Sequence, residues 1–522
     1  MRLSYLPPLM VYMAAGISGL TSIVGTFFVK EYLGLSAAFL AGLAFWVNIP
    51  WALKMPMGHL VDLIWRWKSW LVFLGAGLIT LGLLIMIGLL TDREAMTAVM
   101  PAGSWFVLSA LLSPVGYVIQ DTVADAMTVE AVPRFDNKGE PLDEAAIKLK
   151  HTTMQTLGRF AIIGGSVLVA AVNLYIFKGV QLLSEPEKIL VYRQVYLLAL
   201  AIPLTSVAGV VLAAVVKRRE QAKLLAEGVS PEQIKKAQEQ RHEKTEPNWW
   251  ILGGSLAFVV FTLAIGLSRF AYAQEIIFTG SFLIIAFLIV KLVRELTPAA
   301  RATLLGTIII IFAFRATPTF GAGATWWMID ELHFDQQFIA ILDLIGGILT
   351  LAGIVIFRRF MAERSIAFIV GALTIAATLL TLPYLGMYYG LHEWTSRMTN
   401  GIVDARFIAV VNTMLESPLG QIAMIPMLAW IANSAPPRLK ATYFAVMASF
   451  TNLALSLAQL CTKYLNQVFI VTREVRDPST QAVQVPADYS QLGYLIISAL
   501  AIGLVVPFAA ILIVRISKLK WA

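Results

Sequence analysis

Long apolar stretches alternate with short polar breaks along the whole chain. Each stretch is long enough to cross the roughly 30 Å hydrocarbon core of a bilayer as a helix, which takes about 20 residues. The chain lacks long runs of alternating polar and apolar residues, which argues against a membrane β-barrel. The pattern therefore predicts fourteen membrane-spanning helices, at about residues 7–29, 36–62, 69–90, 103–131, 151–177, 191–216, 249–267, 275–293, 302–329, 336–357, 365–389, 403–432, 441–467 and 490–514.

Composition and charge placement agree with a multi-pass protein embedded in a lipid bilayer. Hydrophobic residues make up 58% of the chain and charged residues 14%, and the mean hydropathy is +0.76. The net charge of +8 reflects cations gathered in alternate loops, such as the segment 217–247, and not a nucleic-acid partner. Because cytoplasmic loops carry excess Lys and Arg, we expect both termini in the cytoplasm, in an inner or plasma membrane.

A short motif occurs twice and indicates an internal duplication. Ser113-Pro114-x-Gly116 recurs as Ser417-Pro418-x-Gly420, 304 residues later, which places the fourth span opposite the twelfth. Two six-span halves that flank two extra spans resemble the major facilitator arrangement, whose halves are related by an axis along the membrane normal. The predicted divisions are an N-terminal half, a charged linker with two extra helices, and a C-terminal half, at residues 1–216, 217–295 and 296–522.

The span 103–131 carries a polar stripe, formed by Gln120, Asp121, Asp125 and Glu130. A charge inside a membrane span costs roughly 2.5–3.5 kcal/mol on insertion scales, so such residues face a cavity or a partner. Asp121 and Asp125 share one helix face about 6 Å apart, and their repulsion favours protonation of one of them. Arg159 falls at nearly the depth of Asp125, and an Asp125–Arg159 pair is expected, either structural or part of gating and coupling.

Further charges fall near the membrane midplane in the C-terminal half. Arg315 and Glu416 lie near the centres of their spans, and we expect Glu416 to hold Arg315 until an anionic substrate competes for the guanidinium. Thr317-Pro318 interrupts its helix, which either frees a carbonyl for a cavity or forms a packing kink. Lys54 either neutralises an acid of the stripe or extends to the inner face, and the second is favoured.

The loop after the second span holds a candidate gating motif, formed by Gly58, Asp62, Arg66 and Lys68. Its Gly-x3-Asp-x3-Arg spacing resembles the signature of major facilitator proteins in this loop. Gly58 permits close helix approach, and Asp62 can accept hydrogen bonds from a helix N-terminus and pair with Arg66. The alternative is an ordinary basic loop that contains one acid.

Three stretches together resemble the folate-biopterin transporter family: Asp121-x3-Asp125-x4-Glu130, Arg315-Ala-Thr-Pro318, and Ser417-Pro-Leu-Gly420 with Ala441-Thr-Tyr-Phe444. The resemblance implies a secondary transporter of the major facilitator fold, with folates or pterins as the best-known substrates. It also implies that Asp121, Arg315 and Glu416 face one cavity. Aromatic candidates for stacking on a flat ring are Tyr117, Phe320, Trp326 and Trp327, although the two tryptophans suit an interfacial belt better.

Several function classes are excluded. The chain has no Gly-rich phosphate loop, no His/Cys cluster with metal-ligand spacing and only one cysteine, Cys461, so we expect neither an enzyme nor a cofactor or metal. The sequence predicts a secondary transporter, coupled to protons or another gradient, for a folate- or pterin-like or other anionic or zwitterionic small molecule. The alternatives are transport of another solute, such as an amino acid, nucleoside or exported drug, and a non-transporting assembly factor on the same fold.

Overall fold

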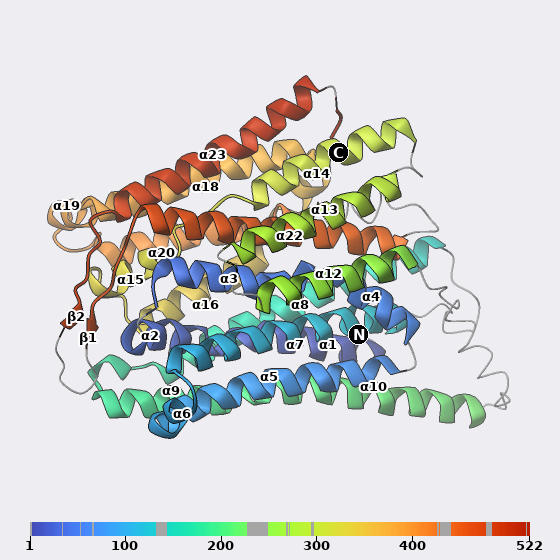
Figure 1. Ribbon diagram of the computed structural model, residues 1–522, viewed down its shortest axis with the longest axis horizontal. Coiled ribbons are helices and arrows are strands. Elements are labelled where there is room, and N and C mark those ends of the chain that lie inside the picture. Colours follow the sequence, from blue (N-terminus) through green and yellow to red (C-terminus); the bar gives the residue numbers. More distant parts are fainter. Residues whose placement is uncertain are drawn as a thin grey trace.

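A computed structural model describes most of the chain. The described residues are 3–33, 35–52, 54–64, 67–131, 144–226, 249–267, 270, 272–293, 297–424, 427, 440–476, 483–517 and 519–521. Helices account for nearly all of the regular structure (Figure 1).

An N-terminal group of helices fills one side of the molecule. Its elements are η1 (Leu3–Tyr5), α1 (Leu6–Gly16), η2 (Ile17–Thr21), α2 (Ser22–Tyr32), α3 (Ala37–Ala52), α4 (Lys54–Leu63), α5 (Lys68–Thr91), α6 (Arg93–Val99), α7 (Ala102–Ala131), α8 (Glu144–Ile176), η4 (Val180–Leu182), α9 (Glu185–Ala199) and α10 (Ala201–Ala226).

Two linking helices precede a C-terminal group. The linking helices are α12 (Trp249–Leu267) and α13 (Ala273–Val293). The C-terminal group contains α14 (Pro298–Arg315), α15 (Ala322–Asp330), α16 (Gln336–Ile356), α17 (Arg358–Glu363), α18 (Ile366–Tyr388), α19 (Leu391–Met398), α20 (Ala405–Glu416), η5 (Ser417–Leu419), α22 (Lys440–Val468), β1 (Val475–Arg476), β2 (Val483–Val485) and α23 (Leu492–Ile516).

These helices confirm the predicted helical membrane protein. Each predicted span coincides with one helix or with consecutive helices, and ten stretches among the described residues are long and apolar enough to cross a membrane. The number fourteen itself stays a prediction. The hairpin formed by β1 and β2 was not predicted; its strands pair antiparallel.

Two spans that we predicted as continuous helices are broken. The span 302–329 divides into α14 and α15, and α20 ends at Glu416 within the predicted span 403–432. Each break coincides with a proline, Pro318 or Pro418, which cannot donate to the preceding helical turn. The two copies of the Ser-Pro-x-Gly motif therefore differ, because α7 continues through Pro114.

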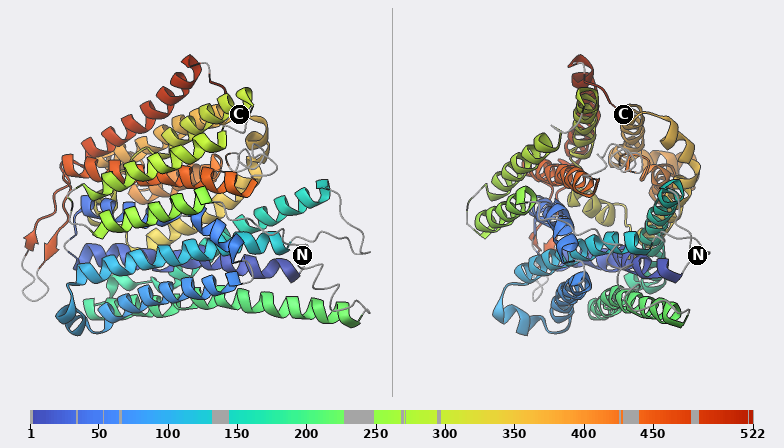
Figure 2. Two further views of the ribbon diagram at one scale, coloured as in Figure 1. Left: turned by 45° about the vertical axis from the view of Figure 1, so that its right-hand side comes forward. Right: turned by 90° about the vertical axis from the view of Figure 1, so that its right-hand side faces the viewer.

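The two groups meet along two helix pairs. Helix α3 packs along α22, and α8 packs along α16, so each pair joins one helix from each group. Figure 2 shows the same division from two further sides. Helix α13 packs on α22 and α12 packs on α4, which places the linking helices beside the first of these pairs. The end of the molecule that holds β1, β2, α2, α6 and α19 is called the hairpin end below (Figure 1).

Small residues allow α5 and α7 to approach closely. A Cβ at Gly75 would lie 2.6 Å from the Gly116 carbonyl oxygen, and a Cβ at Gly116 would lie 2.5 Å from that of Gly75. Gln120 reinforces the contact, because its Nε2 donates to the Val72 carbonyl at 3.1 Å and to Ser206 Oγ on α10 at 2.9 Å. This packing fixes the rotation of α7 and thereby the direction in which its carboxylates point.

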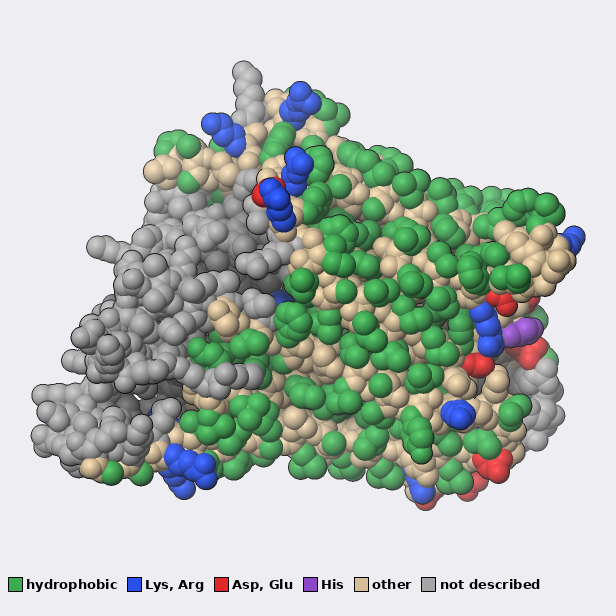
Figure 3. All heavy atoms as spheres, turned by 180° about the vertical axis from the view of Figure 1, so that it is seen from behind, with side chains coloured by type: hydrophobic (Ala, Val, Ile, Leu, Met, Phe, Trp, Pro, Cys, Tyr) green, Lys and Arg blue, Asp and Glu red, His purple; other side chains and the backbone are tan. Residues whose placement is uncertain are grey.

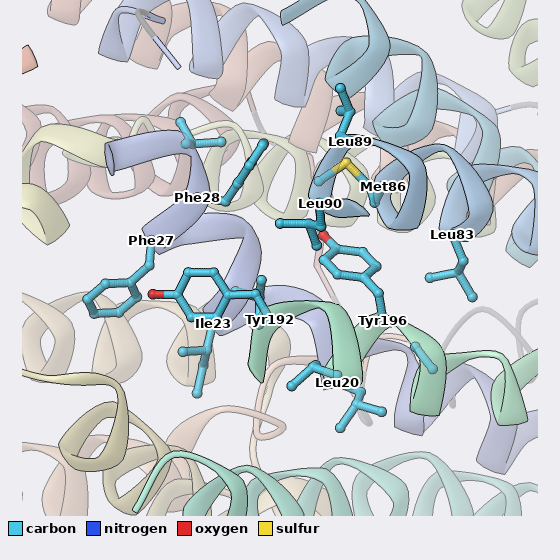
Figure 4. Packing of buried hydrophobic residues seen from close by; sticks show 14 of the residues in the cluster. Leu20, Ile23, Phe27, Phe28, Leu83, Met86, Leu89, Leu90, Tyr192 and Tyr196 are labelled. Carbon is cyan, nitrogen blue, oxygen red and sulfur yellow. The ribbon is translucent and has the colours of Figure 1, made fainter. Parts of the chain in front are cut away.

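The largest apolar cluster of the N-terminal group lies toward the hairpin end. Tyr192 and Tyr196 of α9 pack among side chains from η2, α2 and α5, such as Ile23 and Met86 (Figure 4). Figure 3 shows one face of the surface, where hydrophobic side chains cover the middle and charged ones gather toward the ends. This distribution suits a surface surrounded by lipid.

Candidate functional site

The two carboxylates of α7 share one cation, Lys54. Lys54 Nζ lies 2.5 Å from Asp121 Oδ2 and 2.7 Å from Asp125 Oδ2. Lys54 is the first residue of α4, and a Tyr12 hydroxyl from α1 donates to Asp125 Oδ1 at 2.5 Å. One ammonium and one phenol thus compensate the acidic stripe within the N-terminal group.

Two sequence predictions about this cluster are wrong. Lys54 does not extend to a membrane surface, since α4 packs along α7 and the ammonium lies against the Asp121 and Asp125 carboxylates. The expected Asp125–Arg159 ion pair does not form: Arg159 makes no hydrogen bond or ion pair with any described residue. Its charge nevertheless acts on Asp121 and Tyr12, so Arg159 lies beside the cluster without closing a pair.

Arg315 of the C-terminal group also lacks a carboxylate partner among the described residues. Its Nε donates to the Thr451 carbonyl of α22 at 3.1 Å, and the expected pair with Glu416 does not form. Glu416 instead accepts from Asn412 Nδ2 at 3.4 Å. The positive charges of Arg159 and Arg315 act on one another, so two guanidiniums from opposite groups repel across the boundary between the groups.

The segment between α14 and α15, which follows Arg315, is non-helical and packs on α22. Helix α14 ends at Arg315, and the backbone stays non-helical until α15 begins at Ala322. Thr317 Oγ1 donates to the Phe314 carbonyl at 3.0 Å and so caps the C-terminal end of α14. This hydrogen bond gives Thr317 a structural role at the helix end. Gly321 has φ +74, and a Cβ there would lie 2.9 Å from Asn466 Nδ2 on α22. Broken helices of this kind occur at transporter binding sites.

A cavity of about 300 Å³ adjoins Arg315 inside the C-terminal group. It lies between α14, α18, α22 and the chain after η5, and Arg315 is its only charged lining residue among the described residues. Other lining residues are Phe314, Ile369, Met424, Met427 and Leu455. An apolar cavity with one guanidinium suits a ligand that has a flat apolar part and an anionic group.

Asp343 on α16 is a candidate that the sequence analysis missed. At about 100° per residue, Ala340, Asp343 and Gly347 share one face of α16. A Cβ at Gly347 would meet Val167 of α8, whereas Thr350 donates to the Ser417 carbonyl at 3.0 Å. Asp343 therefore lies between the side of α16 that meets the N-terminal group and the side that meets η5, and it has no hydrogen bond or ion pair with a described residue. An acid within the predicted span 336–357 was the available sequence signal.

Other predicted site residues do not join this arrangement. Gln120 is 2% exposed and bonds α5 and α10, so it packs helices together and does not line the site. Trp326 and Trp327 are 2% and 7% exposed and lie in an apolar cluster with Phe320, which contradicts both the stacking and the interfacial-belt interpretations. Tyr117 likewise packs against the N-terminal apolar cluster.

Two of the four residues of the predicted gating motif lie outside the described part of the chain, namely Arg66 and the side chain of Asp62. The side chain of Glu130 in the polar stripe also lies outside it. A Cβ at Gly58 would meet nothing within 4 Å, so the expected close helix approach at this glycine is not observed among the described residues. Lys68, the last member, is 7% exposed at the start of α5.

Comparisons with known proteins show the family of this chain. A model described as the BT1 family matches residues 15–520. A folate-biopterin transporter of Synechocystis sp. is 22% identical over 85% of this chain and 71% of its own length. Folate transporter 2 of Plasmodium falciparum is 28% identical over 28% of this chain and 31% of its own.

Solved structures show the fold. A peptide transporter of the POT type, crystallised with sulfate, superimposes with a TM-score of 0.58 at 15% identity, over 100% of this chain and 96% of that chain. The nucleoside transporter NupG gives a TM-score of 0.54 at 12% identity, over 98% and 99% of the two chains. The fold is that of major facilitator transporters.

Proposed function

The chain belongs to the BT1 family and is a secondary transporter, and from that premise we propose that it moves a folate- or pterin-like compound, or another anionic or zwitterionic heterocyclic solute, together with protons. The observation that carries the proposal is the pair Arg159 and Arg315, two guanidiniums from opposite groups that act on each other electrostatically and have no carboxylate partner among the described residues.

The two guanidiniums support an anionic substrate. A guanidinium is not deprotonated in proteins, so the two arginines keep their positive charges and repel each other. A bound anion would compensate this repulsion. A carboxylate can accept two parallel hydrogen bonds from one guanidinium. The apolar cavity beside Arg315 offers room for a flat ring attached to that carboxylate. Because the two arginines come from different groups, a bound anion would draw the groups together.

The cluster of Lys54, Asp121 and Asp125 supports proton coupling. One ammonium compensates two carboxylates, which leaves the cluster with a net negative charge unless one carboxylate is protonated. Arg159 stands beside this cluster and also beside Arg315, so a substrate anion that engages Arg159 removes part of its influence on Asp121. Loss of that positive field favours proton uptake by the carboxylate pair, which links the two binding events.

The remaining parts of the proposal concern organisation. We assign residues 1–216 and 296–522 to the two moving halves and residues 217–295 to a linker with two extra helices. The cation-rich loops favour a cytoplasmic location for both termini, in an inner or plasma membrane. The packing of α3 on α22 and of α8 on α16 supports this division, since each pair crosses the boundary between the halves.

Binding of a matched pair of ligands tests the substrate assignment. Folate carries carboxylates that free pterin lacks, and both can be titrated against purified wild type and Arg315→Lys. Lysine keeps the charge but loses the two-pronged geometry, so folate affinity should fall by roughly 1–3 kcal/mol, the range for a charge-assisted hydrogen bond, and pterin affinity much less.

Arg301→Lys on the same helix is the matched control and should change neither affinity. Equal losses of folate and pterin binding in Arg315→Lys would make Arg315 a structural residue and remove the anionic-substrate argument. Binding of an amino acid or a nucleoside, with no binding of folate or pterin, would assign the transporter to another solute class.

A further inference from the structure

Arg473 connects the two groups at the hairpin end. It lies in the chain between α22 and α23, and its Nη1 donates to the Leu35 carbonyl, between α2 and α3, at 3.0 Å. Its guanidinium carbon lies 4.7 Å from the centre of the Trp326 ring of α15. The side chain is 3% exposed. A residue of the C-terminal group thus closes onto the backbone of the N-terminal group.

The hydrogen bonds of Arg473 are incomplete. Its Nε and Nη2 are buried and have no hydrogen-bond partner among the residues that the structure describes. Burial lowers the pKa of Arg473 to about 10, which leaves the guanidinium charged at neutral pH. A buried charged donor without an acceptor costs free energy. The position of Arg473 in this structure is therefore less stable than one in which all of its N–H groups are hydrogen-bonded.

Asp330 is a second potential acceptor for Arg473, besides the Leu35 carbonyl. The negative charge of Asp330, at the end of α15, acts on Arg473. In this structure the Tyr489 hydroxyl donates to Asp330 Oδ2 at 2.5 Å. Asp330, Tyr489 and Arg473 all belong to the C-terminal group, so they move together when the groups separate. The guanidinium therefore has one acceptor across the boundary and one carboxylate on its own side.

We propose that Arg473 is a positioning residue of the transport cycle, a reversible latch that holds the hairpin end closed. With the end closed, it binds the Leu35 carbonyl; with the end open, it turns to the Asp330 carboxylate. Because Arg473 has an acceptor for a charge-assisted hydrogen bond in each state, opening does not leave a buried cation without a partner. This latch is distinct from the motif at residues 58–68 and does not depend on which solute or ion is carried.

A neighbouring contact marks the same boundary. Gln336 Nε2 of α16 donates to the Tyr192 hydroxyl of α9 at 3.0 Å, and these side chains are 4% and 0% exposed. This second link joins two neutral side chains, in contrast to the charged Arg473 contact. Arg473 is therefore the member of this closed end whose charge gives it two defined positions.

Spin-label distances test the latch in the full-length protein. With Cys461→Ser, labels at Val99→Cys on α6 and Met398→Cys on α19 report the separation of the groups at the hairpin end, where both residues are exposed (79% and 71%). Arg473→Ala removes the charge-assisted hydrogen bond from the closed and the open state alike, so the ratio of closed to open populations should no longer respond to changes at the Asp330 carboxylate. Arg473→Lys keeps the charge and should retain part of that response.

Arg406→Ala is the matched control. Arg406 binds the His333 carbonyl at 3.1 Å and stacks over Phe338, the same kinds of contact at the same end, but all within the C-terminal group. It should leave the distances unchanged.

Tyr489→Phe gives a test that does not remove Arg473. It frees Asp330 from its hydroxyl donor, which strengthens the competing partner and should shift the distances toward the open state. Unchanged distances in Tyr489→Phe, an equal shift in Arg406→Ala, or the same Tyr489→Phe shift after Arg473→Ala would overturn the latch and leave Arg473 a packing residue.

Discussion

Removal of Lys54 should destabilise the protein in a way that a second substitution can repair. Lys54→Met keeps the length of the side chain but leaves Asp121 and Asp125 without their shared ammonium. Removing one partner of a buried ion pair costs about 3–5 kcal/mol, because it leaves an uncompensated charge. We expect a loss of unfolding free energy in that range at neutral pH.

The structure also predicts which carboxylate causes the loss. Side-chain exposure is 13% for Asp121 and 38% for Asp125. Solvent screens the more exposed group, whose pair belongs closer to the roughly 0.2–1 kcal/mol of a surface ion pair. Asp125 also accepts from the Tyr12 hydroxyl, which remains in the variant. Most of the loss should therefore come from Asp121, and Lys54→Met/Asp121→Asn should recover more stability than Lys54→Met/Asp125→Asn.

The measurement is unfolding of the purified variants in mixed micelles titrated with SDS, at neutral and at acidic pH. In Lys54→Met the loss should shrink as the pH falls, because protonation removes the uncompensated charge. A negligible cost of Lys54→Met would show that the cluster contributes little to stability. Better rescue by Asp125→Asn than by Asp121→Asn would contradict the burial argument.

Two further predictions concern orientation and Asp343. In a Cys461→Ser background, Phe270→Cys in the turn between α12 and α13 should react with an impermeant thiol reagent from outside, whereas Ala222→Cys should not; the reverse pattern would contradict the proposed orientation. Asp343→Asn should reduce folate uptake by roughly tenfold or more, because an ionisable group inside a membrane span is a functional group by default. The control is Glu363→Gln, whose carboxylate is 57% exposed and bonds Arg359; an equal effect of the two substitutions would make Asp343 unimportant for transport.

The sequence predicted the positions of the helices well, since the bilayer imposes length and apolarity on every span. It also identified Asp121, Asp125 and Arg315, because a charge inside an apolar span is costly enough to need an explanation. At two spans the prediction of a continuous helix was wrong, because the helix breaks at Pro318 or Pro418. A proline can either kink a helix or end it, and only packing against α22 or α16 determines which.

The pairing of the charges could not be predicted. Depth along a span gives the height of a side chain but not the direction in which it points, so Arg159 was assigned to Asp125 at the correct depth without the correct rotation. Gln120 is next to Asp121 in sequence, yet about 100° away around the helix, and it faces α5 and α10. The position of Lys54 could not be predicted because the sequence does not reveal that α4 packs along α7, which brings the ammonium to Asp121.

The central claim is that solute and protons move together through the Asp121 cluster. The most direct test is uptake of labelled folate into proteoliposomes with the internal pH recorded at the same time, for wild type, Asp121→Asn and the control Glu363→Gln. We predict that an acidic exterior drives folate uptake and internal acidification in wild type and in Glu363→Gln. In Asp121→Asn the pH-driven uptake should be lost while folate exchange partly remains. Folate uptake with full pH dependence in Asp121→Asn would contradict the account.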